Sequence, residues 1–245
     1  VMINDVMRFL DNVLTDFIER APEQFDDAKY SAEKERSVGL GVMGFHSYLQ
    51  QHSIPLESVM SKAWNKKIFK HIQEHVDQAS KDLADERGPC PDAADYGYNE
   101  RFSNKTAIAP TASISIICGG ASPGVEPVAA NSYTHKTLSG SFNVRNRYLV
   151  ELLEKHGKNT DDVWSGITTN QGSVSHLDFL TDLEKDVFKT AFELDQKWII
   201  ELSGDRTPFI SQAQSINLFV PADIHKRELH KIHFDAWKKG LKSLY

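Results

Sequence analysis

Cysteine is scarce in this sequence, which has two among its 245 residues, Cys90 and Cys118. Two thiols cannot build a disulfide framework or, by themselves, a structural zinc cluster, so the composition favours the reducing environment of the cytoplasm. Long apolar runs are also missing, because no stretch approaches the roughly 20 residues that a membrane-spanning helix needs. We therefore expect no membrane partner.

An excess of positive charge is missing as well, since the net charge is -6. A protein that binds nucleic acid through its overall field carries the opposite sign, so we expect no nucleic-acid partner. Hydrophobic residues make up 40% of the chain and charged residues 25%, ordinary values for a globular protein that can bury a core.

Apolar residues recur at helical spacing in four stretches of the chain. Their approximate limits are residues 6–18, 58–86, 182–202 and 223 onward. Between them lie short apolar runs, TAIAP at 106–110 and FISQAQSINLF at 209–219, which predict strands. Helices that alternate with strands predict a largely parallel α/β architecture.

The stretch GLGVMG at residues 39–44 fits the pattern G-x-G-x-x-G of a dinucleotide-binding turn. Its context does not fit, because the preceding YSAEKERSV is charged and favours a helix rather than a buried strand. The acidic residue required about 20 positions later is absent around Trp64. The glycines instead favour a short strand over residues 38–42 whose backbone approaches a neighbour closely.

The stretch HIQEH at residues 71–75 resembles a metallopeptidase pattern. Its spacing places His71 and His75 on one helical face, as zinc ligation requires. No separate acidic segment stands out as a third ligand, and both histidines lie beside Trp64 and Ile68 on the helical wheel. We therefore expect histidines packed at the margin of a core, and predict no metal site.

The segment NKTAIAPTASISIICGGASPGVEP, residues 104–127, carries the clearest chemical signal. Its strand ends at Pro110, and the hydroxyl residues Thr111, Ser113 and Ser115 follow at alternate positions. A helix that begins there would present free backbone N–H groups and the positive end of its dipole to an anion. A Ser/Thr helix cap with nothing bound explains the spacing equally well.

The segment IAPTASISIICGGASPGVEPVAANSYTHKTLSGSF closely resembles the phosphate-binding region of the large (α) subunit of class I ribonucleotide reductases. RSVGLGVMGF, GDRTPFISQAQSINLF and HFDAWKKGLKSLY resemble other segments of that family, in the same order along the whole chain. The resemblance implies the C-terminal part of a ten-stranded α/β barrel, with a short C-terminal α/β subdomain. Residues 1–205 would be the second part of the catalytic barrel, and residues 206–245 a barrel strand, a helix and a radical-transfer segment. GLGVMG would then begin a barrel strand.

Enzymes of this family reduce ribonucleoside diphosphates to 2′-deoxyribonucleoside diphosphates through a thiyl radical. By this resemblance, Tyr245 matches the first of two adjacent tyrosines that pass the radical towards the active site. Some members carry a hydroxyl residue where this chain has Ile114, so the backbone would have to bind there. The residues that would hold the substrate diphosphate are Pro110, Thr111, Ala112, Ser113, Ile114 and Ser115.

The resemblance also implies partners. A small radical-generating (β) subunit would supply the radical from its metallo-cofactor, and thioredoxin or glutaredoxin would supply reducing equivalents, so this segment itself would bind no cofactor. The thiyl cysteine and the redox cysteine pair of the family belong upstream of Val1, and neither Cys90 nor Cys118 matches them. We therefore expect a fragment, from a split gene, an intein- or intron-interrupted gene or a truncated record, that is inactive without an upstream fragment.

Three alternatives remain open from the sequence. A class II, cobalamin-dependent reductase shares the barrel and the phosphate loop but needs no radical-generating subunit. A non-catalytic phosphate-binding module would bind nucleotide without an upstream partner. A dehydrogenase built on GLGVMG would bind a nicotinamide dinucleotide.

Overall fold

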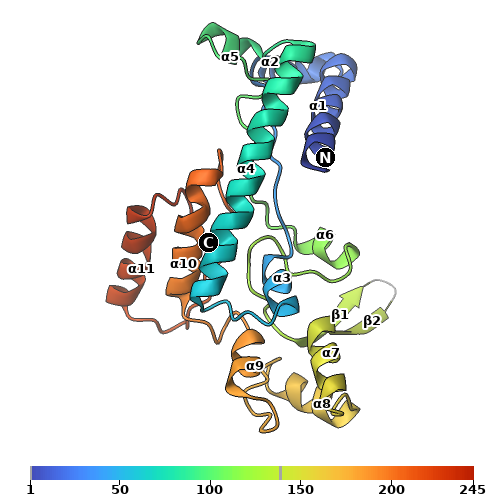
Figure 1. Cartoon of the computed structure of the whole chain (residues 1–245), viewed down its shortest axis with the longest axis vertical. Helices are drawn as coiled ribbons and strands as arrows, with labels where there is room; N and C mark the ends of the chain where they lie inside the picture. The colour runs from blue at the N-terminus through green and yellow to red at the C-terminus, as the bar shows by residue number, and fades with distance from the viewer. Residues whose placement is uncertain (1, 138–139) are drawn as a thin grey trace.

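The computed structural model describes residues 2–137 and 140–245 of the chain (Figure 1). Helices dominate it, and one antiparallel hairpin forms its named strands. The N-terminal elements are α1 (Met2–Arg20), η1 (Glu23–Phe25), α2 (Asp26–Glu35), α3 (Phe45–Gln51), α4 (Val59–Arg87), α5 (Pro91–Asp95) and α6 (Ala112–Ile117). They are followed by β1 (Ser132–Thr137), β2 (Gly140–Arg145), α7 (Arg147–Lys155), α8 (Asp161–Thr169), α9 (Asp182–Val187), α10 (Gln196–Arg206), η2 (Thr207–Phe209) and α11 (Lys226–Lys238).

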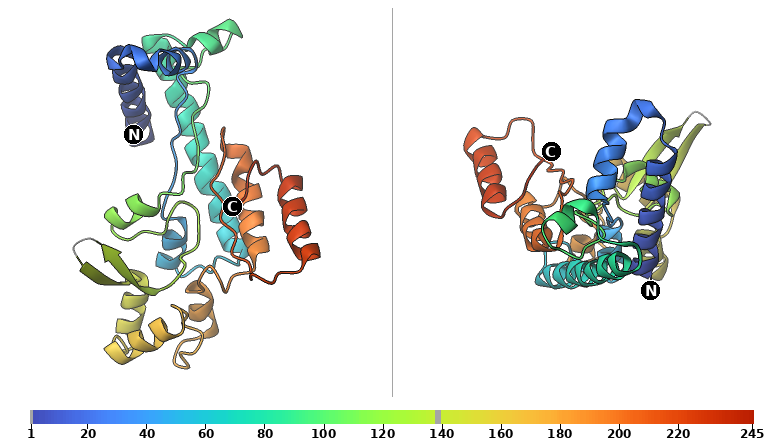
Figure 2. Two further views of the ribbon diagram at one scale, coloured as in Figure 1. Left: turned by 180° about the vertical axis from the view of Figure 1, so that it is seen from behind. Right: turned by 90° about the horizontal axis from the view of Figure 1, so that it is seen from above.

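Helix α4 organises the arrangement, because it packs against α1 near one end and against α10 near the other (Figures 1 and 2). It matches the helix predicted over residues 58–86. The helix begins where the hydroxyl of Ser58 accepts a hydrogen bond from the Ser61 N–H at 3.1 Å, and it ends before Gly88. No helix in the described part of the chain is long and apolar enough to cross a membrane.

The single helix predicted over residues 182–202 is wrong, because the structure divides it into α9 and α10. Thr181 and Glu184 form a capping box that starts α9, and the carboxylate of Asp195 caps α10 by accepting the Lys197 N–H. The turns between them still bury apolar side chains, including Ala191 and Leu194. The apolar side chains therefore keep a helical spacing across residues 182–202, although the caps at Thr181 and Asp195 begin two separate helices.

Short parallel backbone pairings connect segments that lie far apart in the sequence. Leu40 pairs with Thr106, and Ile108 pairs with Gln214. The backbone of Tyr245 continues the series, since its N–H donates to Ile216 O at 2.9 Å and its carbonyl accepts from Leu218 N–H at 3.0 Å. The strands predicted for TAIAP and FISQAQSINLF are wrong, because within the described residues these runs form isolated bridges and no named strand. The parallel direction expected for an α/β architecture is confirmed at the two bridges.

Gly41 lies where two of these segments approach most closely. A Cβ added there would be 2.6 Å from the Ala107 carbonyl oxygen. The close approach predicted for GLGVMG is therefore confirmed at this residue, and it is met by the backbone of a neighbouring segment.

We expect Gly41→Ala to destabilise the protein by about 2 kcal/mol, because relieving the overlap must move backbone atoms. Gly39→Ala is the matched control, since its Cβ would meet the Ala107 methyl group at 3.2 Å and cost less. Urea unfolding of both variants measures the difference. Equal stability of the two variants would contradict this account of the glycine pattern.

Three clusters of buried side chains hold these elements together. The first joins α3, α4 and α10 to the parallel segments, through residues such as Phe45, Phe69 and Ile216. The second lies within α7–α9 and its connections, around Leu149 and Trp164. The third joins α1 to α4 and to residues 38 and 102. The parallel segments therefore have a core beneath them on the α4 side.

Candidate functional site

The turn at Thr111 begins the segment for which anion binding was predicted. Thr111 has φ +51, in the left-handed region, and it directly precedes α6. Its hydroxyl does not cap that helix but accepts a hydrogen bond from the Gly124 N–H at 2.7 Å. An ordinary Ser/Thr cap is therefore not what this residue forms.

The remaining residues of the segment divide between solvent and interior. Ala112, Ser113 and Ile114 are exposed, and as the first residues of α6 their N–H groups have no acceptor in the helix. Ser115 is buried, and its hydroxyl donates to the Ala112 carbonyl at 3.0 Å. The segment therefore offers backbone donors and the Ser113 hydroxyl to solvent.

The loop after α6 is fixed to helix α3. Ser47 and Ser122 exchange two hydrogen bonds, Ser122 N–H to Ser47 Oγ at 2.8 Å and Ser47 N–H to Ser122 Oγ at 3.2 Å. Gly124 has φ +47, and a Cβ there would be 2.9 Å from the Ala109 carbonyl oxygen. The loop that supports Thr111 is thus tied to α3 through Ser47 and Ser122, and at Gly124 it passes too close to the Ala109 carbonyl to admit a side chain.

A cavity of about 450 Å³ brings Pro110 and Tyr245 together. Its walls come from the three parallel segments around residues 107–110, 212–217 and 243–245. Ala112 and Ser115 instead line a separate hollow of about 400 Å³ with Arg145 and Arg147. The predicted phosphate residues are therefore adjacent in the chain but face more than one opening.

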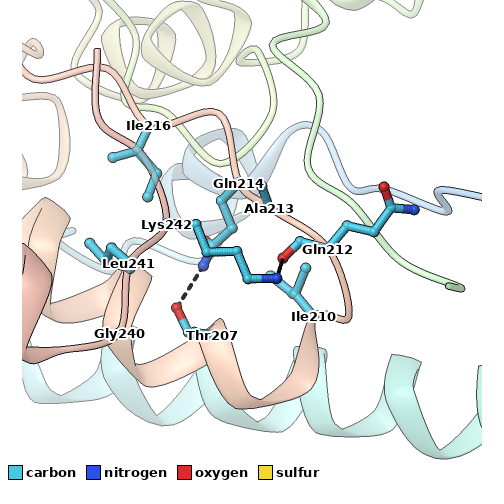
Figure 3. Close-up of a pocket in the computed structure, with 9 residues that line it drawn as sticks. All are labelled: Thr207, Ile210, Gln212, Ala213, Gln214, Ile216, Gly240, Leu241 and Lys242. Carbon is cyan, nitrogen blue, oxygen red and sulfur yellow. Dashed lines mark hydrogen bonds between the residues drawn. The ribbon is translucent and has the colours of Figure 1, made fainter.

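Arg206 is connected to the first cavity through Gln214, a lining residue to which its side chain donates a hydrogen bond. It is 1% exposed, and its Nε donates to Gln214 Oε1 at 2.6 Å. Gln214 in turn donates to Thr207 Oγ1 at 2.9 Å, and Lys242 donates to the Gln212 carbonyl at 2.7 Å, as Figure 3 shows. Burial lowers the pKa of Arg206 to about 9, so the guanidinium remains charged at neutral pH.

Sequence reasoning missed a polar pair beside the cavity, the buried Glu126 and the half-buried Asn217. The amide of Asn217 donates to Glu126 Oε1 at 2.7 Å, and Asn217 lines the cavity. Burial raises the pKa of Glu126, and the hydrogen bond from Asn217 opposes part of that rise. A polar residue inside the apolar run SINLF was the signal available in the sequence.

The histidines of HIQEH differ from the sequence expectation. His71 and His75 are both exposed rather than packed at a core margin, and their rings lie 4.1 Å apart. Within residues 2–137 and 140–245, no three side chains of the kinds that bind metals converge. Exposure of this face of α4 follows from the burial of its opposite face by Phe69 and Val76.

Known proteins and a family model match this chain over nearly its whole length. Residues 2–100 and 92–245 match the family model described as "Ribonucleotide reductase, barrel domain". The ribonucleoside-diphosphate reductase large subunit of Invertebrate iridescent virus 6 is 50% identical over 249 residues, which cover 100% of this chain and 26% of that protein. A putative large subunit of Frog virus 3 is 40% identical and is covered to 43%.

A solved structure is also similar. The "Actinobacillus ureae class Id ribonucleotide reductase alpha subunit" superposes with a TM-score of 0.92 at 38% identity, covering 99% of this chain and 45% of that one. The chain therefore spans less than half the length of these relatives.

Proposed function

The chain belongs to the family of the ribonucleotide reductase barrel domain, and from this premise we propose that it is the substrate-phosphate and radical-transfer portion of a class I large subunit. The complete enzyme would reduce ribonucleoside diphosphates to 2′-deoxyribonucleoside diphosphates by a thiyl-radical mechanism in the cytoplasm. The observation that carries this proposal is the cavity shared by Pro110 and Tyr245.

The residues of this chain would bind and orient the diphosphate. Free N–H groups of Ala112, Ser113 and Ile114 suit phosphate oxygens, because backbone donors at a helix start stabilise an anion without a side-chain charge. Ile114 can contribute only its N–H, which agrees with backbone binding at that position. The Thr111–Gly124 hydrogen bond would hold these donors in place.

Tyr245 would take part in radical transfer. Its phenol can lose an electron and a proton together, which avoids a high-energy phenol cation. Its backbone is fixed by hydrogen bonds to Ile216 and Leu218, while the residue as a whole is 74% exposed in the described structure. A small β subunit with a metallo-cofactor would deliver the radical, and thioredoxin or glutaredoxin would return the cysteine pair of the complete subunit to its reduced form.

The parallel segments would be part of a ten-stranded α/β barrel, completed by chain upstream of Val1. In this proposal residues 1–205 belong to the barrel, and residues 206–245 supply a strand, a helix and the radical-transfer segment. The parallel pairings at Leu40, Ile108 and Tyr245 support this arrangement. Exposed apolar side chains on α1, among them Met2, Phe9 and Val13, support a further layer of protein over that helix.

Removal of the Thr111 hydroxyl tests the phosphate site. We expect Thr111→Val to weaken binding of a ribonucleoside diphosphate to the complete large subunit about tenfold, because the Gly124 N–H loses its acceptor and the loop shifts. Thr111→Ser keeps the hydroxyl and should bind normally. Calorimetric titration with the diphosphate and with the parent nucleoside measures the phosphate contribution.

Thr134→Val is the matched control, because its hydroxyl bonds to Asn143 at 3.2 Å on the exposed hairpin. Binding by Thr111→Val equal to that of the control would contradict the phosphate site. The isolated 245-residue chain, given the small subunit and reduced thioredoxin, should form no deoxyribonucleotide. Product from the isolated chain would contradict its assignment as a fragment.

A further inference from the structure

Glu126 is held in an unusual setting for a carboxyl group. It is 8% exposed, and the one side chain that bonds to it among the described residues is Asn217, at 2.7 Å. No lysine, arginine or histidine in the described structure forms an ion pair with it. The hydrogen bond therefore orients the Glu126 carboxyl group but does not neutralise its charge, since the amide of Asn217 is itself neutral.

On one side, Glu126 is connected to the proposed phosphate segment. It lies two residues after Gly124, whose N–H donates to Thr111 Oγ1. Its own N–H donates to the Pro123 carbonyl at 3.0 Å, which closes a tight turn. A displacement of Glu126 would therefore be transmitted to Thr111 through three residues of fixed backbone.

On the other side, Asn217 is connected to Tyr245. Its two chain neighbours both bond to that residue, because Tyr245 N–H donates to Ile216 O and Leu218 N–H donates to Tyr245 O. Asn217 also lines the cavity that contains Pro110 and Tyr245. The Asn217 side chain thus joins the backbone around Tyr245 to the loop around Gly124.

We propose that Glu126 and Asn217 are positioning residues, whose hydrogen bond keeps Tyr245 in register with the segment that holds the substrate diphosphate. This inference rests on the proposed function and adds to it the contact that aligns the phosphate segment with Tyr245. Neither residue needs to contact the substrate. The backbone pairing of Tyr245 fixes its segment against residues 216–218, and the pair fixes that segment against the phosphate loop.

Variants of the complete large subunit, assayed with the small subunit, test the pair. Asn217→Ala and Glu126→Ala should lower kcat by about tenfold to a hundredfold, because small misplacements of reacting groups cost that much. The dissociation constant for a ribonucleoside diphosphate should change by less than about threefold, since the phosphate donors remain. Glu126→Gln keeps an acceptor for Asn217 and should restore most of the activity.

Asn99→Ala is the matched control, because Asn99 donates to the Asp85 carboxylate at the same 2.7 Å on an exposed surface. A second readout needs no turnover, and uses 3-fluorotyrosine at position 245. Its fluorine resonance should shift or broaden in Asn217→Ala and Glu126→Ala, and should match wild type in Glu126→Gln and Asn99→Ala. Melting curves confirm that each variant is folded.

The outcomes separate the two proposals. A wild-type enzyme that turns over, with unchanged kcat and fluorine resonance in Asn217→Ala and Glu126→Ala, would overturn the positioning pair alone. Equal losses of activity in Asn99→Ala would also overturn it. A wild-type subunit that neither binds the diphosphate nor turns over would overturn the proposed function, while the fluorine resonance would still decide whether the pair positions Tyr245.

Discussion

Replacing Asp11 by asparagine is expected to lower the free energy of unfolding by about 3 to 5 kcal/mol near neutral pH. The carboxylate is 0% exposed and accepts hydrogen bonds from three arginines. Arg36 and Arg87 donate at 2.7 Å, and Arg101 donates at 2.9 Å. Asparagine preserves the volume but removes the carboxylate partner of Arg36 and Arg101 and leaves Arg87, among the described residues, with its 3.4 Å ion pair to Glu86 alone. It also turns an amide donor towards these guanidinium groups.

The effect of Asp11 should depend on pH. Burial tends to raise the pKa of Asp11, but hydrogen bonds from Arg101, Arg87 and Arg36 outweigh it and lower the pKa below its ordinary 3.8. A carboxyl whose pKa is lowered by folding stabilises the protein above the unfolded value, and loses that contribution as the pH falls through the folded one. The difference in free energy of unfolding between wild type and Asp11→Asn should therefore narrow below about pH 4.

Urea unfolding at several pH values between about pH 7 and about pH 3 measures this gap. Asp16→Asn on the same helix is the control, because the Asp16–Arg20 pair is mostly exposed and should contribute less than about 1 kcal/mol. A gap that stays constant down to the lowest pH would contradict the role given to the Asp11 charge.

Arg206→Ala is expected to cost a similar amount, about 3 to 5 kcal/mol. The side chain donates to Gln214 at 2.6 Å, Ser203 at 2.7 Å and Asn65 at 3.2 Å, with no carboxylate among these acceptors. Alanine leaves all three buried acceptors unpaired and opens a cavity between the rings of Phe45 and Phe69. Both losses act in the core that supports the parallel segments.

Two variants separate the cavity from the hydrogen bonds. Arg206→Met fills most of the volume without donors, so its loss should fall between that of Arg206→Ala and zero. Arg20→Ala is the control, because Arg20 is exposed and its loss should stay within about 0.5 kcal/mol. Denaturant unfolding of the three variants ranks their losses of stability. A stability of Arg206→Ala equal to that of Arg20→Ala would contradict the role given to the buried hydrogen bonds.

Family membership and the placement of the long helix could be predicted from the sequence. Helix α4 has its Ser58 cap, its apolar spacing and its terminal glycine within 31 residues, and such signals depend only on neighbours in the chain. The close approach at Gly41 was predictable for a related reason, because glycine in an apolar run indicates that something must come near. The local pattern does not indicate which residue approaches Gly41, which is Ala107 in the structure.

The break between α9 and α10 shows where local reasoning fails. The apolar period over residues 182–202 is helical, yet Thr181 and Asp195 start two separate helices. The Asp195 N–H is satisfied by the Glu57 carboxylate at 2.6 Å, a partner 138 residues away. Such a distant acceptor makes the interruption favourable, and periodicity alone cannot indicate it.

The sequence by itself determined the family resemblance, the candidate phosphate residues and Tyr245, because these depend on residue identities in order. Only the tertiary structure brought Pro110 and Tyr245 to one cavity, paired Glu126 with Asn217, and gathered three arginines around Asp11. These contacts join residues that lie 25 to 135 positions apart, shown by Asp11 with Arg36 and by Pro110 with Tyr245. Their formation depends on how parallel segments and helices pack, since burial in a shared core selects partners that neighbouring residues do not specify.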